Sequence, residues 1–117
     1  MKERIFVLDD EENMVEVIKT ALEEEGYEVE GFTSPEDFLS AFEEEDCELL
    51  ITDIRMMGMD GIEILRKVKE MEPDLAVILI TAYPSFETAL EALRGGAVDY
   101  IPKPFEMEEL KWLSLIH

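Results

Sequence analysis

Several short apolar segments of this sequence end in polar residues of the kinds that take part in phosphoryl transfer. Asp9 and Asp10 directly follow one apolar segment, and Asp53 closes a second. Thr81 closes a third segment, and Lys103 follows a fourth. If these segments are parallel strands of one sheet, their carboxyl ends lie at the same edge, where open α/β sheets bind ligands. The sequence therefore predicts that these residues converge on one crevice.

The three aspartates would repel one another and raise one another's pKa unless a cation lay among them. Hard oxygen ligands with room for water suit Mg2+ better than a soft metal. With Mg2+ bound, Asp53 could stay ionised as a nucleophile toward phosphorus, while the ion and the Lys103 ammonium offset charge on the phosphoryl oxygens. The Thr81 hydroxyl could donate to one of those oxygens. These residue types therefore indicate a Mg2+-dependent phosphoryl transfer.

The segments that must position these residues alternate between strand-like and helix-like patterns. The apolar run 5–8 is short and continuous, which is typical of a strand covered on both faces. Ser34 followed by Pro35 is a helix start, and Gly26 stands where a preceding helix would end. Such alternation predicts a doubly wound α/β fold with a parallel sheet. The expected strands are 5–8, 27–32, 49–53, 76–81 and 99–102, and the expected helices are 12–25, a second from 35, 62–71, 86–94 and a last from about 107.

The composition fits one folded domain with an acidic surface. The 117 residues suffice for a single hydrophobic core. The 30 acidic and 10 basic residues give a net charge of −20, which disfavours binding to nucleic acid or to an anionic membrane. The single cysteine, Cys47, cannot form an internal disulfide and is expected to be a buried packing residue. Because no signal peptide or membrane-spanning stretch is recognisable, we expect a cytoplasmic location.

The motifs at these strand ends, taken together, carry a family resemblance. The motifs are Asp9-Asp10-Glu11, Asp53, Met59-Asp60-Gly61, Thr81-Ala82 and Lys103-Pro104-Phe105. In their order along the chain they resemble the receiver domains of bacterial two-component response regulators, and the match covers nearly the whole sequence. This resemblance implies a flavodoxin/CheY-like (βα)5 fold with a five-stranded parallel sheet in the order 2-1-3-4-5.

The resemblance assigns a role to each residue of the site. It implies that Asp53 is the phosphoacceptor and that Asp10, Asp53 and the backbone carbonyl of Arg55 bind Mg2+ directly. Asp9 would help to hold the ion through water. Thr81 and Lys103 would sense the phosphoryl group.

Further positions near the site also match the family. Tyr100 is similar to the switch aromatic, whose ring would turn inward when Thr81 moves toward the phosphoryl group. Arg55 and Tyr83 occupy variable positions that would tune the lifetime of the phosphoryl group. The resemblance also implies a cis peptide bond between Lys103 and Pro104.

The resemblance extends to partners. It implies a sensor histidine kinase as phosphodonor and an output domain or partner protein that controls transcription, as in regulators of the nitrogen-regulator type. We expect residues 1–117 to form one receiver domain, the N-terminal part of a longer response regulator. A homodimer through helix 86–94, strand 99–102 and the last helix is a further expectation. Because of its acidity, this domain itself is not expected to bind nucleic acid or a membrane.

Two other functions remain open on the sequence alone. Phosphatases of the haloacid dehalogenase type also use an aspartate at a strand end with Mg2+, but they usually carry a second acid two residues later, where this chain has Arg55. A flavodoxin-like module would need a phosphate-binding loop after the first strand, where Asp10-Glu11-Glu12 would repel phosphates.

Each residue also has a simpler structural explanation. Asp9 and Asp10 could cap a helix, Thr81 could be an ordinary strand residue, and Lys103 could be a solvated surface charge. Tyr100 could merely pack.

Other apolar residues are expected to serve packing. Phe86, Phe105 and Trp112 are interpreted as packing residues, and His117 as a terminal residue without a role in the mechanism. The methionines are interpreted as filler, although those at 56, 57 and 59 could form a soft docking surface beside the site.

The last turns carry more apolar residues than one buried stripe needs, so a partner or further chain could cover the excess. The crowded positions are Leu110, Trp112, Leu113, Leu115 and Ile116.

Overall fold

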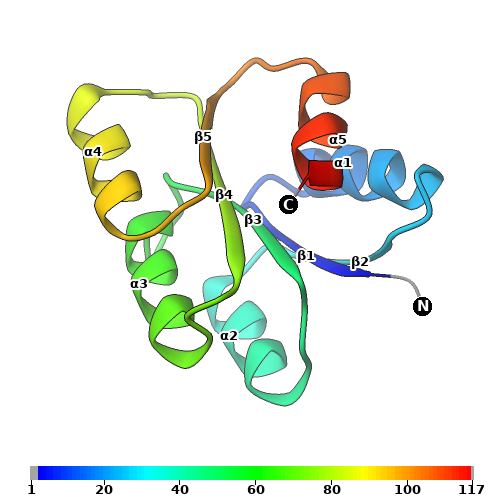
Figure 1. Cartoon of the computed structure of the whole chain (residues 1–117), viewed down its shortest axis with the longest axis horizontal. Coiled ribbons are helices and arrows are strands. Elements are labelled where there is room, and N and C mark those ends of the chain that lie inside the picture. The colour runs from blue at the N-terminus through cyan, green and yellow to red at the C-terminus, as the bar shows by residue number, and fades with distance from the viewer. Residues whose placement is uncertain (1–2, 117) are drawn as a thin grey trace.

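The computed structural model describes the backbone of residues 3–116 and the side chains of residues 3–115. His117 lies outside the described residues, as does the side chain of Ile116. Within the described range, five strands alternate with five helices, as predicted (Figure 1). The elements are β1 (Arg4–Leu8), α1 (Glu12–Glu24), β2 (Glu28–Phe32), α2 (Pro35–Glu44), β3 (Leu49–Asp53), α3 (Gly61–Met71), β4 (Ala76–Thr81), α4 (Phe86–Arg94), β5 (Asp99–Pro102) and α5 (Met107–Ile116).

The strands form one parallel sheet in the order β2-β1-β3-β4-β5, which confirms the predicted fold class and strand order. The register places Leu8 opposite Thr52, so that the first residues beyond β1 lie beside the end of β3. Asp53 pairs with Ile80, one residue before the end of β4. The chain segments that carry the candidate site therefore end at the same edge of the sheet.

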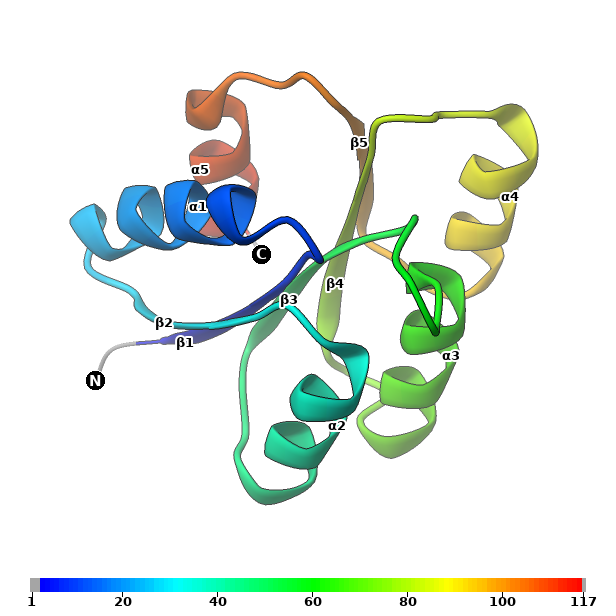
Figure 2. The ribbon, with the colours of Figure 1, turned by 180° about the vertical axis from the view of Figure 1, so that it is seen from behind.

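Two helical layers cover the sheet, which explains why the interior strands β1, β3 and β4 are largely apolar. α1 and α5 lie on one face, and α2, α3 and α4 lie on the other (Figures 1 and 2). Along β1, Ile5 and Val7 pack in the core beneath α1 and α5, whereas Phe6 and Leu8 pack in the core beneath the other helices. Alternate side chains of a strand point to opposite faces, so a strand that is covered twice needs apolar residues throughout.

The ends of several elements follow from local chemistry. Ser34 caps α2, its hydroxyl accepting a hydrogen bond from the backbone N–H of Asp37, and Gly26 takes a positive φ of 97° after α1; both features were predicted. Gly61, the first residue of α3, lies against the backbone of β3. A Cβ atom at this position would overlap the carbonyl oxygen of Asp53 and approach the Cα atom of Ile54 to 2.8 Å. Glycine therefore lets α3 begin directly beside the phosphoacceptor candidate.

The prediction that Phe86 and Trp112 are interior packing residues is wrong. Their relative exposures are 76% and 62%, respectively, because each lies on the outer face of its helix. Phe105 does pack against the core beneath α1 and α5, and Cys47 is half-buried rather than fully buried.

The expected excess of apolar surface on α5 is present at Trp112 and at Leu115, which is 70% exposed. By contrast, Leu110 is buried. No helix in the described part of the chain is long and apolar enough to cross a membrane.

The cluster of phenylalanine rings beneath α2 should contribute strongly to stability. Phe38 is fully buried, with its ring 6.0 Å from that of Phe6 and 5.5 Å from that of Phe42. We expect Phe38→Ala to lower the free energy of unfolding by about 3–5 kcal/mol, because it removes buried apolar surface and leaves a cavity. We expect the matched control Phe86→Ala to change it by no more than about 0.5 kcal/mol. Urea denaturation measures both values, and equal losses would contradict this account of the core.

Candidate functional site

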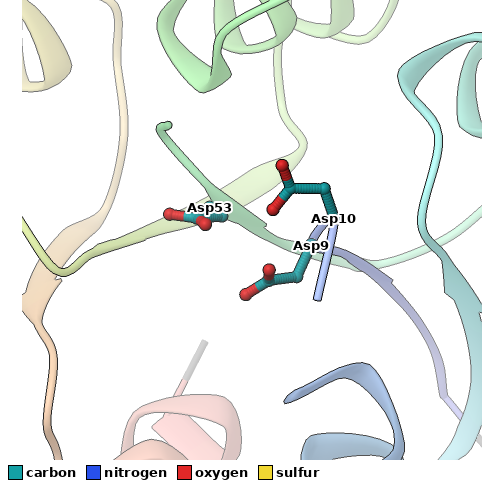
Figure 3. Close-up of side chains that lie close together, drawn as sticks. All are labelled: Asp9, Asp10 and Asp53. Carbon is teal, nitrogen blue, oxygen red and sulfur yellow. The ribbon is translucent and has the colours of Figure 1, made fainter. Parts of the chain in front are cut away.

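The predicted carboxylates meet at the carboxyl edge of the sheet. Asp9 and Asp10 follow β1, and Asp53 is the last residue of the neighbouring strand β3. One carboxylate oxygen of each residue lies within 4.8 Å of the other two. Figure 3 shows the three side chains gathered where these strands end. The structure thus brings the adjacent residues Asp9 and Asp10 together with Asp53, which is distant from them in the sequence.

These carboxylates differ in their surroundings. Asp9 has no exposed surface and Asp53 is only 5% exposed, whereas Asp10 is open to solvent. Asp9 accepts a hydrogen bond from the backbone N–H of Glu11 at 2.9 Å, and Asp10 accepts a longer one from the backbone N–H of Met57 at 3.4 Å. Burying charged carboxylates is unfavourable unless cations compensate them.

Lys103 supplies one such cation. Its Nζ atom lies 2.9 Å from Oδ2 of Asp9 and 3.4 Å from Oδ2 of Asp53, and only 11% of its side chain is exposed. The backbone N–H of Lys103 donates to the carbonyl oxygen of Thr81 at 2.6 Å, which holds the start of the loop after β5 beside the end of β4. The Lys103–Pro104 peptide bond is cis, as expected. Lys103 therefore faces the carboxylates, and it is not the solvated surface charge of the simpler explanation.

Burial and neighbouring charges in the site shift the pKa of Asp53 and of Lys103. Burial raises the pKa of Asp53, and the charge of Asp9 raises it further, while Lys103 opposes both effects. Burial would lower the pKa of Lys103, but its hydrogen bonds to Asp9 and Asp53 and the charges of these residues together raise it. The ammonium thus stays protonated, and it does not fully compensate the negative charge around Asp53.

The residues present fit a hard divalent cation. Oδ1 of Asp53 is buried and finds no hydrogen-bond partner among the residues whose side chains are described. A buried carboxylate oxygen without a partner is unfavourable, and a metal ion would satisfy it. The donors that meet here are all carboxylate oxygens, the ligands that Mg2+ prefers. Asp10, which faces solvent, leaves room for the water that Mg2+ retains.

Thr81 ends β4, the strand next to β3, and is buried. Its hydroxyl oxygen accepts a hydrogen bond from the backbone N–H of Tyr83 at 3.0 Å. Because β4 pairs with β3 up to Asp53 and Ile80, Thr81 lies one step further along the same edge. The hydroxyl is thus available at the edge of the site that the sequence predicted.

Tyr100 is half-buried and makes contacts that the sequence did not predict. Its hydroxyl lies 2.7 Å from the hydroxyl of Thr88 and accepts a hydrogen bond from the backbone N–H of Ser85 at 3.2 Å. Ser85 also caps α4. The Tyr100 hydroxyl therefore links β5 to the first turn of α4. A serine directly before a helix is a recognisable N-cap signal, but it does not reveal that the tyrosine hydroxyl contacts the same helix start.

Arg55 and Tyr83, which were predicted separately, form a pair. The Arg55 guanidinium lies 5.4 Å from the centre of the Tyr83 ring, within the range of a cation–π interaction. Arg55 belongs to the loop after β3 and Tyr83 to the loop after β4. Both side chains are exposed, so this contact spans two loops at the open side of the site.

Residues 5–113 match the family model described as response regulator receiver domain. The chain is 41% identical over 107 residues to the regulatory protein AtoC of Escherichia coli (strain K12), which covers 92% of this chain and 23% of AtoC. It is 38% identical over 108 residues to the DNA-binding transcriptional regulator NtrC of Proteus hauseri, with coverage of 92% and 23%. The chain thus spans about a quarter of the length of these curated relatives.

Solved structures of receiver domains and response regulators are also similar to this chain. The BeF3-activated DrrB receiver domain superimposes with a TM-score of 0.92 at 33% identity, covering 99% of this chain and 97% of that one. The response regulator TrrA of Thermotoga maritima in complex with Mg2+-BeF gives a TM-score of 0.88 at 35% identity, with 97% of each chain covered. The beryllofluoride-activated NtrC4 receiver domain dimer gives 0.90 at 32% identity, with coverage of 97% and 93%.

The charge of Asp53 should destabilise the fold when no metal is present. Because its folded-state pKa is raised, the folded chain retains this proton to a higher pH than the unfolded chain does, so stability falls as the pH rises through that window. At neutral pH in a chelating buffer, Asp53→Asn should therefore raise the melting temperature. A gain of about 1 kcal/mol would correspond to about 4 °C in a domain of this size. Added Mg2+ should stabilise the unmodified chain but not this variant.

Glu24→Gln is the control for this experiment, since it removes an exposed acid far from the site. It should change stability by no more than about 0.5 kcal/mol, with or without Mg2+. A lower melting temperature for Asp53→Asn than for the unmodified chain in chelating buffer would contradict the electrostatic account.

Proposed function

Because this chain belongs to the response regulator receiver domain family, we propose that Asp53 is its phosphoacceptor and that the phosphodonor is a sensor histidine kinase. The observation that carries this assignment is the meeting of Asp9, Asp10 and Asp53 within 4.8 Å, with the Lys103 ammonium 3.4 Å from Asp53. Nucleophile, candidate metal ligands and a phosphate-binding cation therefore occupy one edge of the sheet. This is the arrangement that an in-line phosphoryl transfer requires.

In the proposed reaction, a carboxylate oxygen of Asp53 attacks the phosphorus of a phosphohistidine. A bond from this oxygen to phosphorus forms, the bond from phosphorus to the imidazole nitrogen breaks, and the imidazole leaves with the electron pair of that bond. Asp53 must be ionised to attack. Burial and the charge of Asp9 raise its pKa, so its carboxylate is more reactive and its ionised form is less stable. Water later hydrolyses the acyl phosphate, so the chain catalyses both its own phosphorylation and its reset.

The remaining members of the site have supporting roles in this proposal. Asp10, Asp53 and the backbone carbonyl of Arg55 would hold Mg2+ directly, and Asp9 would do so through water. When bound, the ion would offset charge on the phosphoryl oxygens. Lys103 can leave Oδ2 of Asp53 and move to a phosphoryl oxygen without leaving Asp9, to which it is closer.

Phosphorylation is proposed to change the face formed by α4, β5 and α5. Thr81 would donate its hydroxyl to the phosphoryl group and give up the hydrogen bond from the Tyr83 N–H. Movement of Thr81 would make room for the Tyr100 ring, whose hydroxyl would then leave Thr88. Two packings of this kind can be populated before phosphorylation, and the modification would shift their ratio.

The output of the proposed switch is transcription. This proposal rests on the relatives AtoC and NtrC, which are named as a regulatory protein and a transcriptional regulator and are about four times longer than the aligned region. We propose that a longer cytoplasmic protein carries this domain at its N-terminus. A dimer through α4, β5 and α5 is supported by the exposed side chains Phe86, Leu93 and Val98 on or beside those elements, and by the dimer reported for NtrC4.

A small phosphodonor tests the central assignment. Incubation with acetyl phosphate and Mg2+ should add one labile phosphoryl group to the chain, measured by intact mass spectrometry. Asp53→Asn should abolish this modification, and Asp10→Asn or a chelator should strongly reduce it, because the site would no longer bind Mg2+. Asp74→Asn, which removes an exposed acid elsewhere, should leave the modification unchanged. Phosphorylation that persists in Asp53→Asn would refute the assignment, and steady hydrolysis of phosphate esters would favour a phosphatase instead.

The contact between Arg55 and Tyr83 should lengthen the lifetime of phosphorylated Asp53. The pair spans the loops on either side of the opening, so it can restrict the approach of water. We expect Arg55→Ala and Tyr83→Ala each to accelerate loss of the phosphoryl group after the donor is removed. In a double-mutant cycle the two effects should be coupled by about two- to fivefold, the rate equivalent of a cation–π contact of about 0.5 to 1 kcal/mol. Arg66→Ala, another exposed arginine, is the control, and additive effects of the paired substitutions would show that the contact does not act as a unit.

A further inference from the structure

A groove beside the phosphorylation site has no role in the proposed reaction. It lies between the N-terminus of α2 and the loop that joins β3 to α3. Its volume is about 380 Å³. Apolar side chains line it together with two exposed carboxylates, which we call its rim. The apolar residues are Pro35, Leu39, Met57 and Met59, and the rim carboxylates are Glu36 and Glu63.

The apolar lining is partly open to solvent. Met57 is 86% exposed, and Leu39 and Met59 are half-buried, each resting with one side against the core. Exposed apolar surface that gathers in a concave site is typical of an interaction surface. Methionine side chains are flexible and polarisable, so they can adapt to different apolar partners.

The rim of the groove is negatively charged. Glu36 lies in the first turn of α2, and Glu63 lies in the first turn of α3. The N-terminal dipole of a helix stabilises an ionised carboxylate there. Within the described part of the chain no basic residue lines the groove, and the net charge of the chain is −20. Its occupant is therefore expected to carry positive charge beside its apolar side chains.

The groove is formed in the folded chain without a partner. Ser34 caps α2, and Asp60 caps α3 by accepting a hydrogen bond from the backbone N–H of Glu63 at 2.9 Å. The loop between them is held by the hydrogen bond from the backbone N–H of Met57 to Asp10. A preformed site avoids the entropic penalty of ordering a loop on binding.

We propose that this groove binds a basic amphipathic helix of a partner protein. An apolar side chain of that helix would insert between Met57, Met59 and Leu39, while lysine or arginine residues would lie against Glu36 and Glu63. A second copy of this chain would bring a further net charge of −20 to the same acidic rim, and an anionic membrane or nucleic acid would be repelled. This inference does not depend on phosphorylation of Asp53.

The test uses a synthetic helical peptide of leucine and lysine, with the leucines along one face, in buffer without Mg2+ or phosphodonor. NMR spectra of the chain with 13C-labelled methionine methyl groups should show saturable shifts at Met57 and Met59. Substitution of both by glutamine should weaken binding by about tenfold, which corresponds to about 1.4 kcal/mol. Glu36→Gln with Glu63→Gln should also weaken it and reduce its salt dependence. Met71→Gln, at the far end of α3 and 46% exposed, should have no effect.

Two peptide controls and one concentration series can overturn the proposal. A peptide of the same composition in scrambled order should bind much more weakly, because it has the charge but no apolar face. Equal binding of both peptides, or shifts that spare Met57 and Met59, would show adsorption to the acidic surface at large and would overturn the proposal. Shifts at Met57 and Met59 that follow the concentration of the chain alone would assign the groove to a second copy and would equally overturn it. A leucine–glutamate peptide of the same pattern should not bind.

Discussion

The attraction between the Lys103 ammonium and two buried carboxylates is the interaction on which the site depends. Asp9 has no exposed surface, and Lys103 lies 2.9 Å from it and 3.4 Å from Asp53. Without this cation, two like charges would be buried side by side, which is strongly unfavourable. Lys103 follows β5, whereas its partners follow β1 and end β3. The carboxylates are therefore compensated only where β1, β3, β4 and β5 are assembled in the sheet.

The same contact leaves the site ready to bind a further cation. One ammonium faces three carboxylates, and Oδ1 of Asp53 finds no partner among the described side chains. The repulsion that remains between Asp9 and Asp53 raises the pKa of Asp53. A divalent ion would relieve this repulsion and satisfy the free oxygen at once. In the proposed function, part of the affinity for Mg2+ thus originates in the unfavourable electrostatics of the metal-free fold.

The sequence predicted those features that follow from local patterns. Apolar runs ending in acids identified the strands, and the parallel order placed Asp9, Asp53 and Lys103 at one edge. Exposure on a helix was harder to predict, because Phe86 is apolar yet lies on the outer face of α4. Contacts between loops could not be predicted at all. The pair of Arg55 with Tyr83 depends on how two loops come together, and the bonds of Tyr100 to Thr88 and Ser85 depend on how β5 packs beside the start of α4.

The backbone connects the charged centre to the face where the proposed switch acts. The N–H of Lys103 donates to the carbonyl of Thr81 at 2.6 Å, so the residue that is proposed to bind the phosphoryl group and the residue that is proposed to sense it share a hydrogen bond. Tyr100 lies on β5, three residues before Lys103, and holds the first turn of α4 through Thr88. A displacement of either Thr81 or Lys103 must therefore strain the link between β5 and α4. This link consists of a few hydrogen bonds at a partly exposed position, each worth about 1 kcal/mol. A single modification can therefore shift the equilibrium between the two packings of Tyr100 without unfolding the core beneath it.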